Sequence, residues 1–158
     1  MIKFLGELPK DVYIAASGGI DSMVILDFLS IASRNIHVLH FNHGTKYAKI
    51  AELLVKDHCE NKNIPLSIGN IKSKKKARES QEEYWRRERY DFFSNFTDKK
   101  IITCHHLCDQ VENYLFTMLN GKEMLIPYSR DNFIRPFLIT KKKSLIDWAN
   151  DKRVSYAS

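Results

Sequence analysis

The sequence predicts an α/β fold in which a parallel sheet of about five strands carries helices on both faces. Short apolar runs alternate along the chain with longer segments whose apolar residues recur every three or four positions. This strand–helix unit occurs four times, and such repetition is typical of a parallel sheet. The 158 residues can bury a core without a disulfide or a metal, so we expect one domain spanning residues 1–158.

The first half of the chain predicts three strands and two helices. Residues 11–17 (DVYIAAS) form an apolar run typical of a buried strand, and residues 21–34 follow with the periodicity of a helix. Residues 35–42 predict a second strand, and residues 46–63 predict a second helix. Residues 64–71 predict a short third strand.

The second half repeats this pattern after a lysine-rich segment. A helix is predicted over residues 80–96, where Ser80 and Glu83 have the spacing of a capping box. The remaining predicted elements are a strand over 99–106, a helix over 108–121, an extended segment over 132–139 and a helix over 141–153.

Composition is that of a globular protein of a reducing compartment. Hydrophobic residues make up 44% of the chain and charged residues 28%, and no apolar run approaches the ~20 residues that span a bilayer. The first residues lack the layout of a signal peptide, and three cysteines do not suggest a disulfide framework. We therefore expect a cytoplasmic protein that makes no membrane contact.

The net charge of +6 is unevenly distributed. Basic residues gather in the runs 72–78, 86–89 and 141–143. Such runs can contact a phosphate backbone, or they can form an ordinary solvated surface. Charge alone leaves both interpretations open.

Polar residues are concentrated where three predicted strands end. The first strand ends at SGGIDS (17–22), the second at HFNHG (40–44) and the fourth at CHHLCDQ (104–110). Ligands of open parallel sheets bind beyond the carboxyl ends of the strands. These three segments are therefore predicted to form one site.

The glycine pair in SGGIDS joins a strand to a helix. A helix N-terminus offers unpaired N–H groups that hold anions, and glycine lets the backbone approach a phosphate closely. Asp21 suits either Mg²⁺ or a helix cap. The motif lacks the lysine of the common ATPase loop, and a simple Gly-Gly turn with an aspartate cap explains the same residues.

SGGIDS after a buried strand resembles the signature of the PP-loop ATP pyrophosphatases, whose fold is Rossmann-like and is called adenine nucleotide alpha hydrolase-like. Within that group, the chain resembles the catalytic domain of the tRNA(Ile)-lysidine synthetases. The segments that carry this resemblance are HFNHG (40–44), RRERY (86–90), HHLCDQVEN (105–113), NG (120–121) and IRPFL (134–138).

The resemblance implies an ATP-dependent ligase that uses ATP and Mg²⁺ and acts on tRNA(Ile) and lysine. Such enzymes adenylate the C2 carbonyl of a wobble cytidine, and the ε-amine of lysine then displaces AMP. The implied pyrophosphate- and ATP-binding residues are Ser17, Gly18, Gly19, Ile20, Asp21, Ser22, His43, Arg86 and Arg89. The implied catalytic residues are Asp21, His105, His106, Asp109 and Glu112, with Asp21 also the Mg²⁺ ligand.

Each of these roles has a plainer alternative. Asp109 and Glu112 share a helix face and can hold or deprotonate the lysine ammonium, but acids in a first turn also simply complement the helix dipole. Arg86 and Arg89 suit phosphate contacts, but they can also form a solvated face.

The chain departs from the family pattern at several positions. Cys108 stands where the family has an aspartate, Asn113 replaces a threonine, and Thr45-Lys46 replaces Leu-Arg. The chain ends before a family acidic element and is expected to lack the C-terminal tRNA-binding domains, as a minimal form or a fragment. Alternatives are therefore a catalytically impaired nucleotide-binding module, a tRNA thiolase and a small-molecule ligase. Cys104 and Cys108 flanking two histidines also raise the possibility of zinc.

Overall fold

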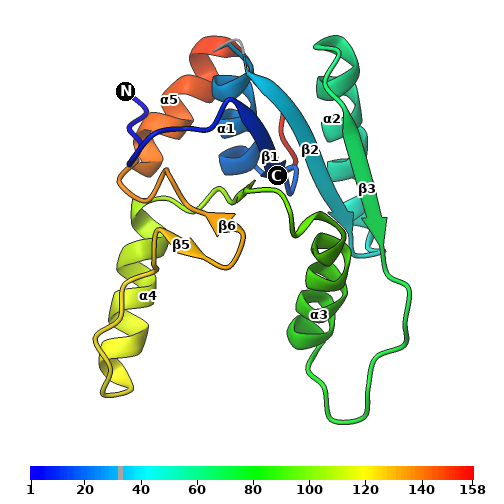
Figure 1. Ribbon diagram of the computed structural model, residues 1–158, viewed down its shortest axis with the longest axis vertical. Coiled ribbons are helices and arrows are strands. Elements are labelled where there is room, and N and C mark those ends of the chain that lie inside the picture. The colour runs from blue at the N-terminus through cyan, green and yellow to red at the C-terminus, as the bar shows by residue number, and fades with distance from the viewer. Residues whose placement is uncertain (32–33) are drawn as a thin grey trace.

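The computed structural model describes residues 1–31 and 34–158, and it confirms the predicted α/β fold. Across these residues the sheet has six strands in the order β3-β2-β1-β4-β6-β5, all parallel except β5, which runs antiparallel to β6 (Figure 1). The strands are β1 Asp11–Ala15, β2 Asn35–Asn42, β3 Leu66–Asn70, β4 Ile101–Ile102, β5 Ser129–Arg130 and β6 Phe133–Ile134. The helices are α1 Ile20–Ile31, α2 Lys46–Asn61, α3 Gln81–Phe93, the 3₁₀ turn η1 Ser94–Phe96, α4 Leu107–Leu119 and α5 Lys142–Lys152.

Helices cover both faces of the sheet, as predicted. Alternation along β1 sends Val12 and Ile14 into a core shared with α1, α2 and α5. Tyr13 and Ala15 point the other way, against a second apolar cluster that contains Phe92 and Phe93 of α3. The neighbouring strands β1 and β2 therefore hold in place the loops that follow their carboxyl ends.

Several predicted boundaries were wrong in the second half. The strand predicted over 99–106 is paired only at Ile101–Ile102, because the chain turns away from β1 toward α4 soon afterwards. The extended segment predicted over 132–139 is a strand only at Phe133–Ile134, since Pro136 lacks the N–H that a continued ladder needs and residues 136–139 form a turn. β5, which pairs with β6, was not predicted.

The predicted helices agree better with the structure. The Ser80–Glu83 capping box forms at the start of α3, whose predicted end at 96 is the 3₁₀ turn η1. α4 begins at Leu107, one residue earlier than predicted, and α5 spans Lys142–Lys152. The helix predicted over 21–34 ends at Ile31 in the structure, and its residues 32–33 lie outside the described part.

Two segments project beyond the carboxyl edge of the sheet, with the rest of the molecule above them (Figure 1). One is α4, in which none of the described residues is buried. The other is the loop of residues 71–80 between β3 and α3. The apolar residues exposed on α4 are Val111, Leu115, Phe116, Met118 and Leu119. No helix within residues 1–31 or 34–158 is long and apolar enough to cross a bilayer.

Candidate functional site

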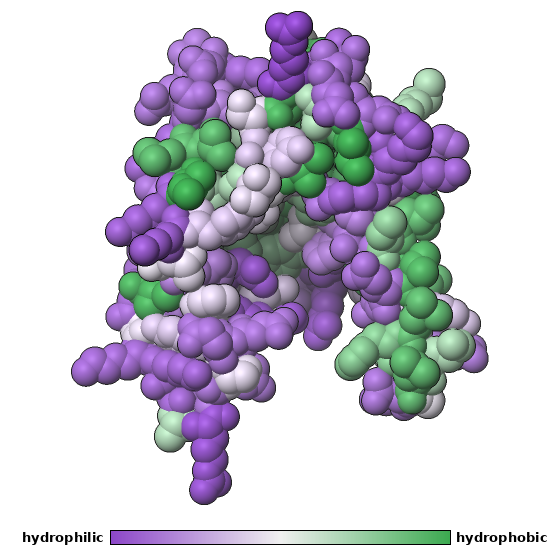
Figure 2. All heavy atoms as spheres, turned by 180° about the vertical axis from the view of Figure 1, so that it is seen from behind, coloured by the Kyte–Doolittle hydropathy of each residue, from purple (hydrophilic) through white to green (hydrophobic). Residues whose placement is uncertain are grey.

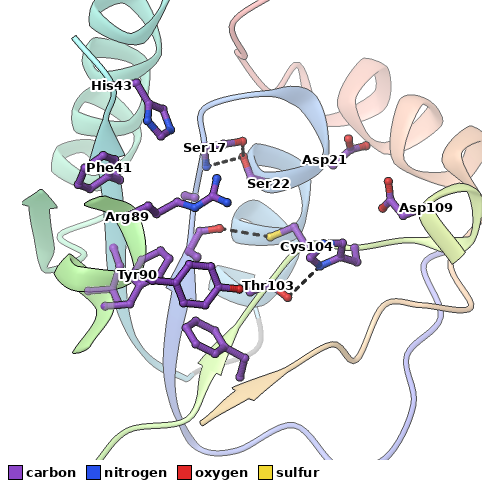
Figure 3. Close-up of a pocket in the computed structure, with 16 residues that line it drawn as sticks. Ser17, Asp21, Ser22, Phe41, His43, Arg89, Tyr90, Thr103, Cys104 and Asp109 are labelled. Carbon is purple, nitrogen blue, oxygen red and sulfur yellow. Dashed lines mark hydrogen bonds between the residues drawn. The ribbon is translucent and has the colours of Figure 1, made fainter. Parts of the chain in front are cut away.

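A pocket of about 330 Å³ opens at the carboxyl edge of the sheet, between the three polar segments that the sequence singled out (Figure 3). Seven of the predicted site residues line it: Ser17, Asp21, Ser22, His43, Arg89, His105 and Asp109. Gly18, Gly19 and Ile20 form the loop behind this lining, and His106 lies just outside it, against Asp21. Arg86 and Glu112 are exposed and do not line the pocket.

The loop between β1 and α1 is folded around the hydroxyl of Ser22. Ser22 Oγ accepts the N–H groups of Ser17 and Gly18, both at 3.1 Å, and donates to the carbonyl of Gly19 at 3.0 Å. These bonds curl the backbone so that the first turn of α1 faces the pocket. The N–H groups of a first helical turn have no partner within the helix, so they are available to an anion.

Gly18 is required in this loop for two reasons. Its φ is +87°, a conformation that residues with a side chain rarely adopt. A Cβ on Gly18 would also lie 2.7 Å from the Cβ of Ala51 in α2. Gly19 has neither constraint, since the nearest atom to its added Cβ is Ser17 Oγ at 3.7 Å. The end of the chain returns to the same loop, where the N–H of Ala157 donates to the Gly18 carbonyl at 2.9 Å.

Asp21 is held by an ammonium group and an imidazole from distant parts of the chain. The ammonium of Lys142, at the start of α5, lies 2.5 Å from Asp21 Oδ1, and His106 Nε2 lies 3.5 Å from the same oxygen. Partial burial opposes ionisation of Asp21, but the hydrogen bonds from His106 and Lys142 outweigh it and lower the pKa of the carboxyl. Sequence reasoning missed Lys142, for which the only signal was the basic run 141–143.

His106 links Asp21 to Asp109. Its Nδ1 accepts the N–H of Cys108 at 3.2 Å and lies 3.6 Å from Asp109 Oδ2, so its proton sits on Nε2, toward Asp21. The hydrogen bond with Asp21 raises the pKa of His106 against the effect of burial. Asp109 in turn accepts the backbone N–H of His106 at 2.7 Å, which completes a capping box at the start of α4. Asp109 thus caps its helix and also faces the pocket beside Asp21, as Figure 3 shows.

The two histidines that line the pocket, His105 and His43, are held neutral. Burial lowers the pKa of His105, whose Nδ1 lies 3.0 Å from the hydroxyl of Thr103. Burial also lowers the pKa of His43, with the charge of Arg89 adding to the effect, and its ring packs against Phe41 and Trp85. Neutral imidazoles in a pocket can donate or accept hydrogen bonds without adding charge.

The two arginines of α3 have different surroundings. Arg89 is half-buried and points into the pocket beneath the Ser17–Ser22 loop (Figure 3), where it supplies a positive charge. Arg86 is exposed, with its guanidinium 5.1 Å from the ring centre of Tyr90.

The remainder of the pocket is apolar. Its apolar lining comes from Leu39, Phe41, Tyr90, Phe93 and Phe133. Cys104 also lines it, and burial raises the pKa of its thiol far above the usual range, so the group stays protonated. Cys108 is exposed on α4, away from that lining. A charged rim around the β1–α1 loop beside an apolar, aromatic interior suits a ligand with an anionic end and a flat hydrophobic end.

Comparisons with known proteins agree with this geometry. The chain is 33% identical over 163 residues to the bifunctional TilS/HprT protein of Listeria innocua, covering 90% of this chain and 25% of that protein. It is 32% identical to the tRNA(Ile)-lysidine synthase of Buchnera aphidicola and 30% identical to that of a Thermotoga species, covering 93% of this chain in both cases and 37% and 39% of those proteins. The chain therefore spans about a quarter to two fifths of the length of these curated relatives.

Solved structures share the fold at low identity. The NH₃-dependent NAD synthetase of Campylobacter jejuni, solved with a nitrate ion, superposes with a TM-score of 0.60 at 16% identity and covers 93% of this chain and 66% of that one. The NMN synthetase of Francisella tularensis gives 0.58 at 15% identity, with coverage of 92% and 62%. The family model of the PP-loop domain matches residues 3–158, nearly the whole chain, and the glycine loop on Ser22 lies within that match. The chain therefore belongs to the PP-loop domain family.

Proposed function

We propose that this chain is the ATP-dependent catalytic part of a tRNA(Ile)-lysidine synthetase, with residues 1–158 acting as a single PP-loop unit in the cytoplasm. The observation that carries the proposal is the pocket itself, where the Ser17–Ser22 loop, Arg89 and the Asp21–His106–Asp109 chain meet at one edge of the sheet. The similarity to tRNA(Ile)-lysidine synthases over about nine tenths of the chain supports this choice of substrate.

ATP fits the two halves of the pocket. The first-turn N–H groups of α1 would hold the β- and γ-phosphates, and the aromatic residues of the interior would hold the adenine. Lys142, whose ammonium lies at Oδ1 of Asp21, would supply the cation that the loop sequence lacks. Arg89 balances the charge of the phosphate chain from the opposite wall.

Mg²⁺ fits this site in company with the nucleotide. Within the described residues, no three His, Cys, Asp or Glu side chains gather to hold a metal ion by themselves. Magnesium at nucleotide sites takes one or two carboxylates together with phosphate oxygens and water. Asp21, at the start of α1 in the pocket lining, would supply a carboxylate of this kind. When bound, the ion would neutralise charge on the phosphates.

The reaction has two steps, each with identifiable residues. In the first, the C2 oxygen of the cytidine attacks the α-phosphorus and the bond to pyrophosphate breaks, with Ser22, Arg89 and Lys142 around the leaving group. In the second, the ε-amine of lysine attacks C2, and AMP leaves with the oxygen. The amine must first lose a proton, and Asp109 and Glu112, three residues apart on α4, can bind the ammonium and take that proton.

AMP and pyrophosphate release tests the proposal. ATP, lysine and unmodified tRNA(Ile) together are expected to give one AMP for each tRNA modified, and omission of lysine or of tRNA is expected to stop turnover. Binding of ATP without release of AMP, with any tRNA, would contradict the ligase assignment.

A nucleotide-binding module without ligation is the second candidate, and Cys108 favours it. This residue stands beside Asp109 in the first turn of α4, where the resembling enzymes carry an aspartate. Cys108→Asp restores that carboxylate. Under the second candidate, AMP release is absent in the wild type and appears in this variant, whereas under the ligase assignment the wild type is already active.

A further inference from the structure

The loop of residues 71–80 carries a dense group of cations. Residues 72–78 are all exposed, and they contain no acidic residue. The cations are Lys72, Lys74, Lys75, Lys76 and Arg78. A polar loop with this charge and so few apolar residues ordinarily has little to fix its shape.

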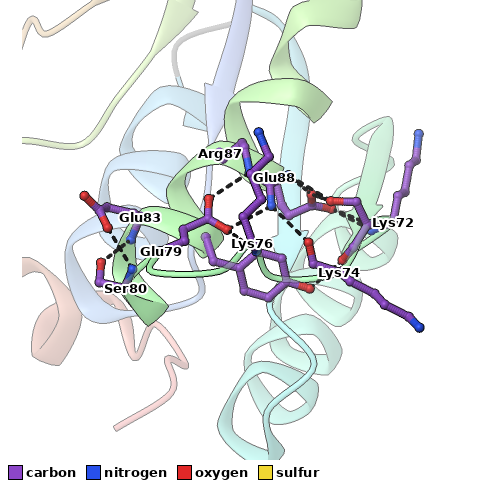
Figure 4. Close-up of polar contacts among 10 residues, drawn as sticks. Lys72, Lys74, Lys76, Glu79, Ser80, Glu83, Arg87 and Glu88 are labelled. Carbon is purple, nitrogen blue, oxygen red and sulfur yellow. Dashed lines mark hydrogen bonds and ion pairs between the residues drawn. The ribbon is translucent and has the colours of Figure 1, made fainter.

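Side chains from α3 hold this loop in place (Figure 4). Glu88, which is only 5% exposed, accepts the backbone N–H groups of Lys72 at 2.7 Å and Ser73 at 3.0 Å, and also the Ser73 hydroxyl. Tyr84 donates its hydroxyl to the Ser73 carbonyl at 2.6 Å. Arg87 donates to Ser73 Oγ at 2.8 Å.

The same contacts occupy the nearby carboxylates. Glu79 is bound by Arg87 and by the N–H of Lys76, and Glu83 is committed to the capping box with Ser80. Hydrogen bonds from Ser73 and Lys72 lower the pKa of Glu88 to about 2, so this carboxylate stays ionised at neutral pH. Among the described residues, no carboxylate lies within 4.0 Å of a charged nitrogen of the five loop cations. The carboxylates of Glu79 and Glu88 therefore fix the backbone of the loop, and the side chains of the five loop cations face solvent.

The loop is at the same edge of the molecule as the pocket. The loop lies beside α3, and α4 projects from the opposite side of the molecule in the same direction (Figure 1). Figure 2 shows the molecule from behind, hollowed between these two projections. Arg86 is exposed on α3, and Arg89, one turn later, lines the pocket, so positive charge continues from the loop toward the pocket.

We propose that the loop of residues 72–78 is a docking surface for the phosphate backbone of RNA, which it holds so that one base reaches the pocket. This inference rests on the proposed function, because that function supplies an RNA substrate. Fixed cations on one side of a hollow are the arrangement that attracts a polyanion. An anionic membrane is disfavoured as the partner, since stable attachment needs apolar side chains and residues 72–80 offer only Ala77.

The test is the salt dependence of RNA binding. The variant K74S/K75S/K76S removes three exposed charges, and the control K10S/K99S/K100S removes three lysines next to the amino ends of β1 and β4, at the opposite edge. The dissociation constant is measured for unmodified tRNA(Ile) transcript between about 50 and 200 mM salt.

The loop variant is expected to lose about 2 to 3 units of the slope of log affinity against log salt, because each lost phosphate contact removes roughly 0.7 to 0.9. Over this salt range the wild-type affinity then falls roughly 20- to 40-fold more than that of the loop variant. The control variant is expected to keep the wild-type slope. Equal slopes for the loop and control variants would overturn the docking surface.

A second pair of variants tests whether RNA binding depends on the fixed shape of the loop or only on its charge. Glu88→Gln makes the protein more positive and yet is expected to weaken RNA binding, because a single amide oxygen cannot accept the bonds that hold residues 72–73. Glu82→Gln makes the same charge change at an exposed position of α3 and is expected to bind RNA as well as the wild type or better. Tighter binding by Glu88→Gln would show that the loop needs no fixed shape and would overturn that part of the inference.

ATP binding by each variant distinguishes failure of the docking surface from failure of the proposed function. The loop variants are expected to bind ATP as the wild type does, since residues 72–78 do not line the pocket. Wild-type protein that binds ATP, with RNA affinity unchanged in the loop variant, refutes the docking surface alone. Wild-type protein that binds no ATP refutes the proposed function instead. Binding to phosphatidylserine vesicles that is lost in the loop variant, without any loss of RNA affinity, would identify a membrane as the partner and contradict RNA docking.

Discussion

Lys142→Met removes the ammonium at Asp21 while it keeps most of the length and apolar stem of the side chain. Lys142 and Asp21 are each about one third exposed, at 34% and 32%, so solvent screens their attraction. Pairs of this kind contribute roughly 0–1 kcal/mol to stability, and the variant is expected to unfold within that range of the wild type. A charge-assisted hydrogen bond to a phosphate is worth about 1.5–3 kcal/mol, so ATP binding should weaken by roughly 10- to 150-fold.

The matched control is Lys143→Met. Lys143 is the next residue of α5, its side chain is 83% exposed, and it pairs with Asp147 in solvent. Both variants lose one positive charge from the same helical turn. Isothermal titration of MgATP gives the dissociation constants, and urea unfolding gives the stabilities.

The two variants discriminate between a local contact and general electrostatics. Lys143→Met is expected to bind ATP within a few-fold of the wild type, because a screened surface charge several ångströms further away contributes little. Equal weakening by both variants, or wild-type affinity in Lys142→Met, would refute the assignment of Lys142 to the phosphates.

Three further predictions concern the glycines of the Ser17–Ser22 loop, the carboxylate of Asp21 and the carboxylate of Glu88. Gly18→Ala should destabilise the fold by about 2–5 kcal/mol in urea unfolding, from the positive φ and the clash with Ala51 together, whereas Gly19→Ala should cost less than about 1 kcal/mol. Asp21→Ala should abolish ATP-dependent AMP release while its circular dichroism stays native, and undiminished turnover would remove Asp21 from the site. The pKa of Glu88 is depressed from 4.5 to about 2 in the folded chain, so its stabilising contribution is present above pH 4.5 and is lost as the pH falls toward 2. The stability gap between wild type and Glu88→Gln should therefore shrink by about 2 kcal/mol from pH 6 to pH 3, and a constant gap would contradict the depressed pKa.

Local patterns were enough to predict the strands β1 and β2. β1 and β2 are strands of five and eight residues, each followed by a periodic helix, so pattern and tertiary contacts agree there. β4 and β6 have two residues each, and pairing with a neighbouring strand rather than their own sequence defines them. No periodicity can be read from two residues, which is why those boundaries were wrong.

The candidate site was predictable where its residues lie within one motif. Ser17, Gly18 and Ser22 bond to one another across five residues, and the sequence of that one motif already offered a phosphate cradle beside a simple turn. Lys142 lies 121 positions from Asp21, and only the packing of α5 on α1 brings them together. The three lysines of 141–143 look alike in the sequence, and only the helix phase decides which of them reaches the site.

For the basic loop of residues 72–78, too, the sequence predicted one part of the arrangement and only the structure shows the rest. Its charge was evident from the sequence, which left both a solvated surface and a phosphate contact open. What favours the phosphate contact is the bonding of Glu88 to the backbone of Lys72 and Ser73, across sixteen and fifteen positions. Sequence spacing gives no sign of such a long-range contact.

The fate of the cytidine C2 oxygen tests the central claim most directly. A tRNA(Ile) whose wobble cytidine carries heavy oxygen at C2 is incubated with ATP and lysine, and the products are analysed by mass spectrometry. If the pocket adenylates that carbonyl, the label leaves the tRNA and is found in AMP, and lysine is found on the cytidine. Unlabelled AMP, or a tRNA that keeps its heavy oxygen while ATP is consumed, would contradict it.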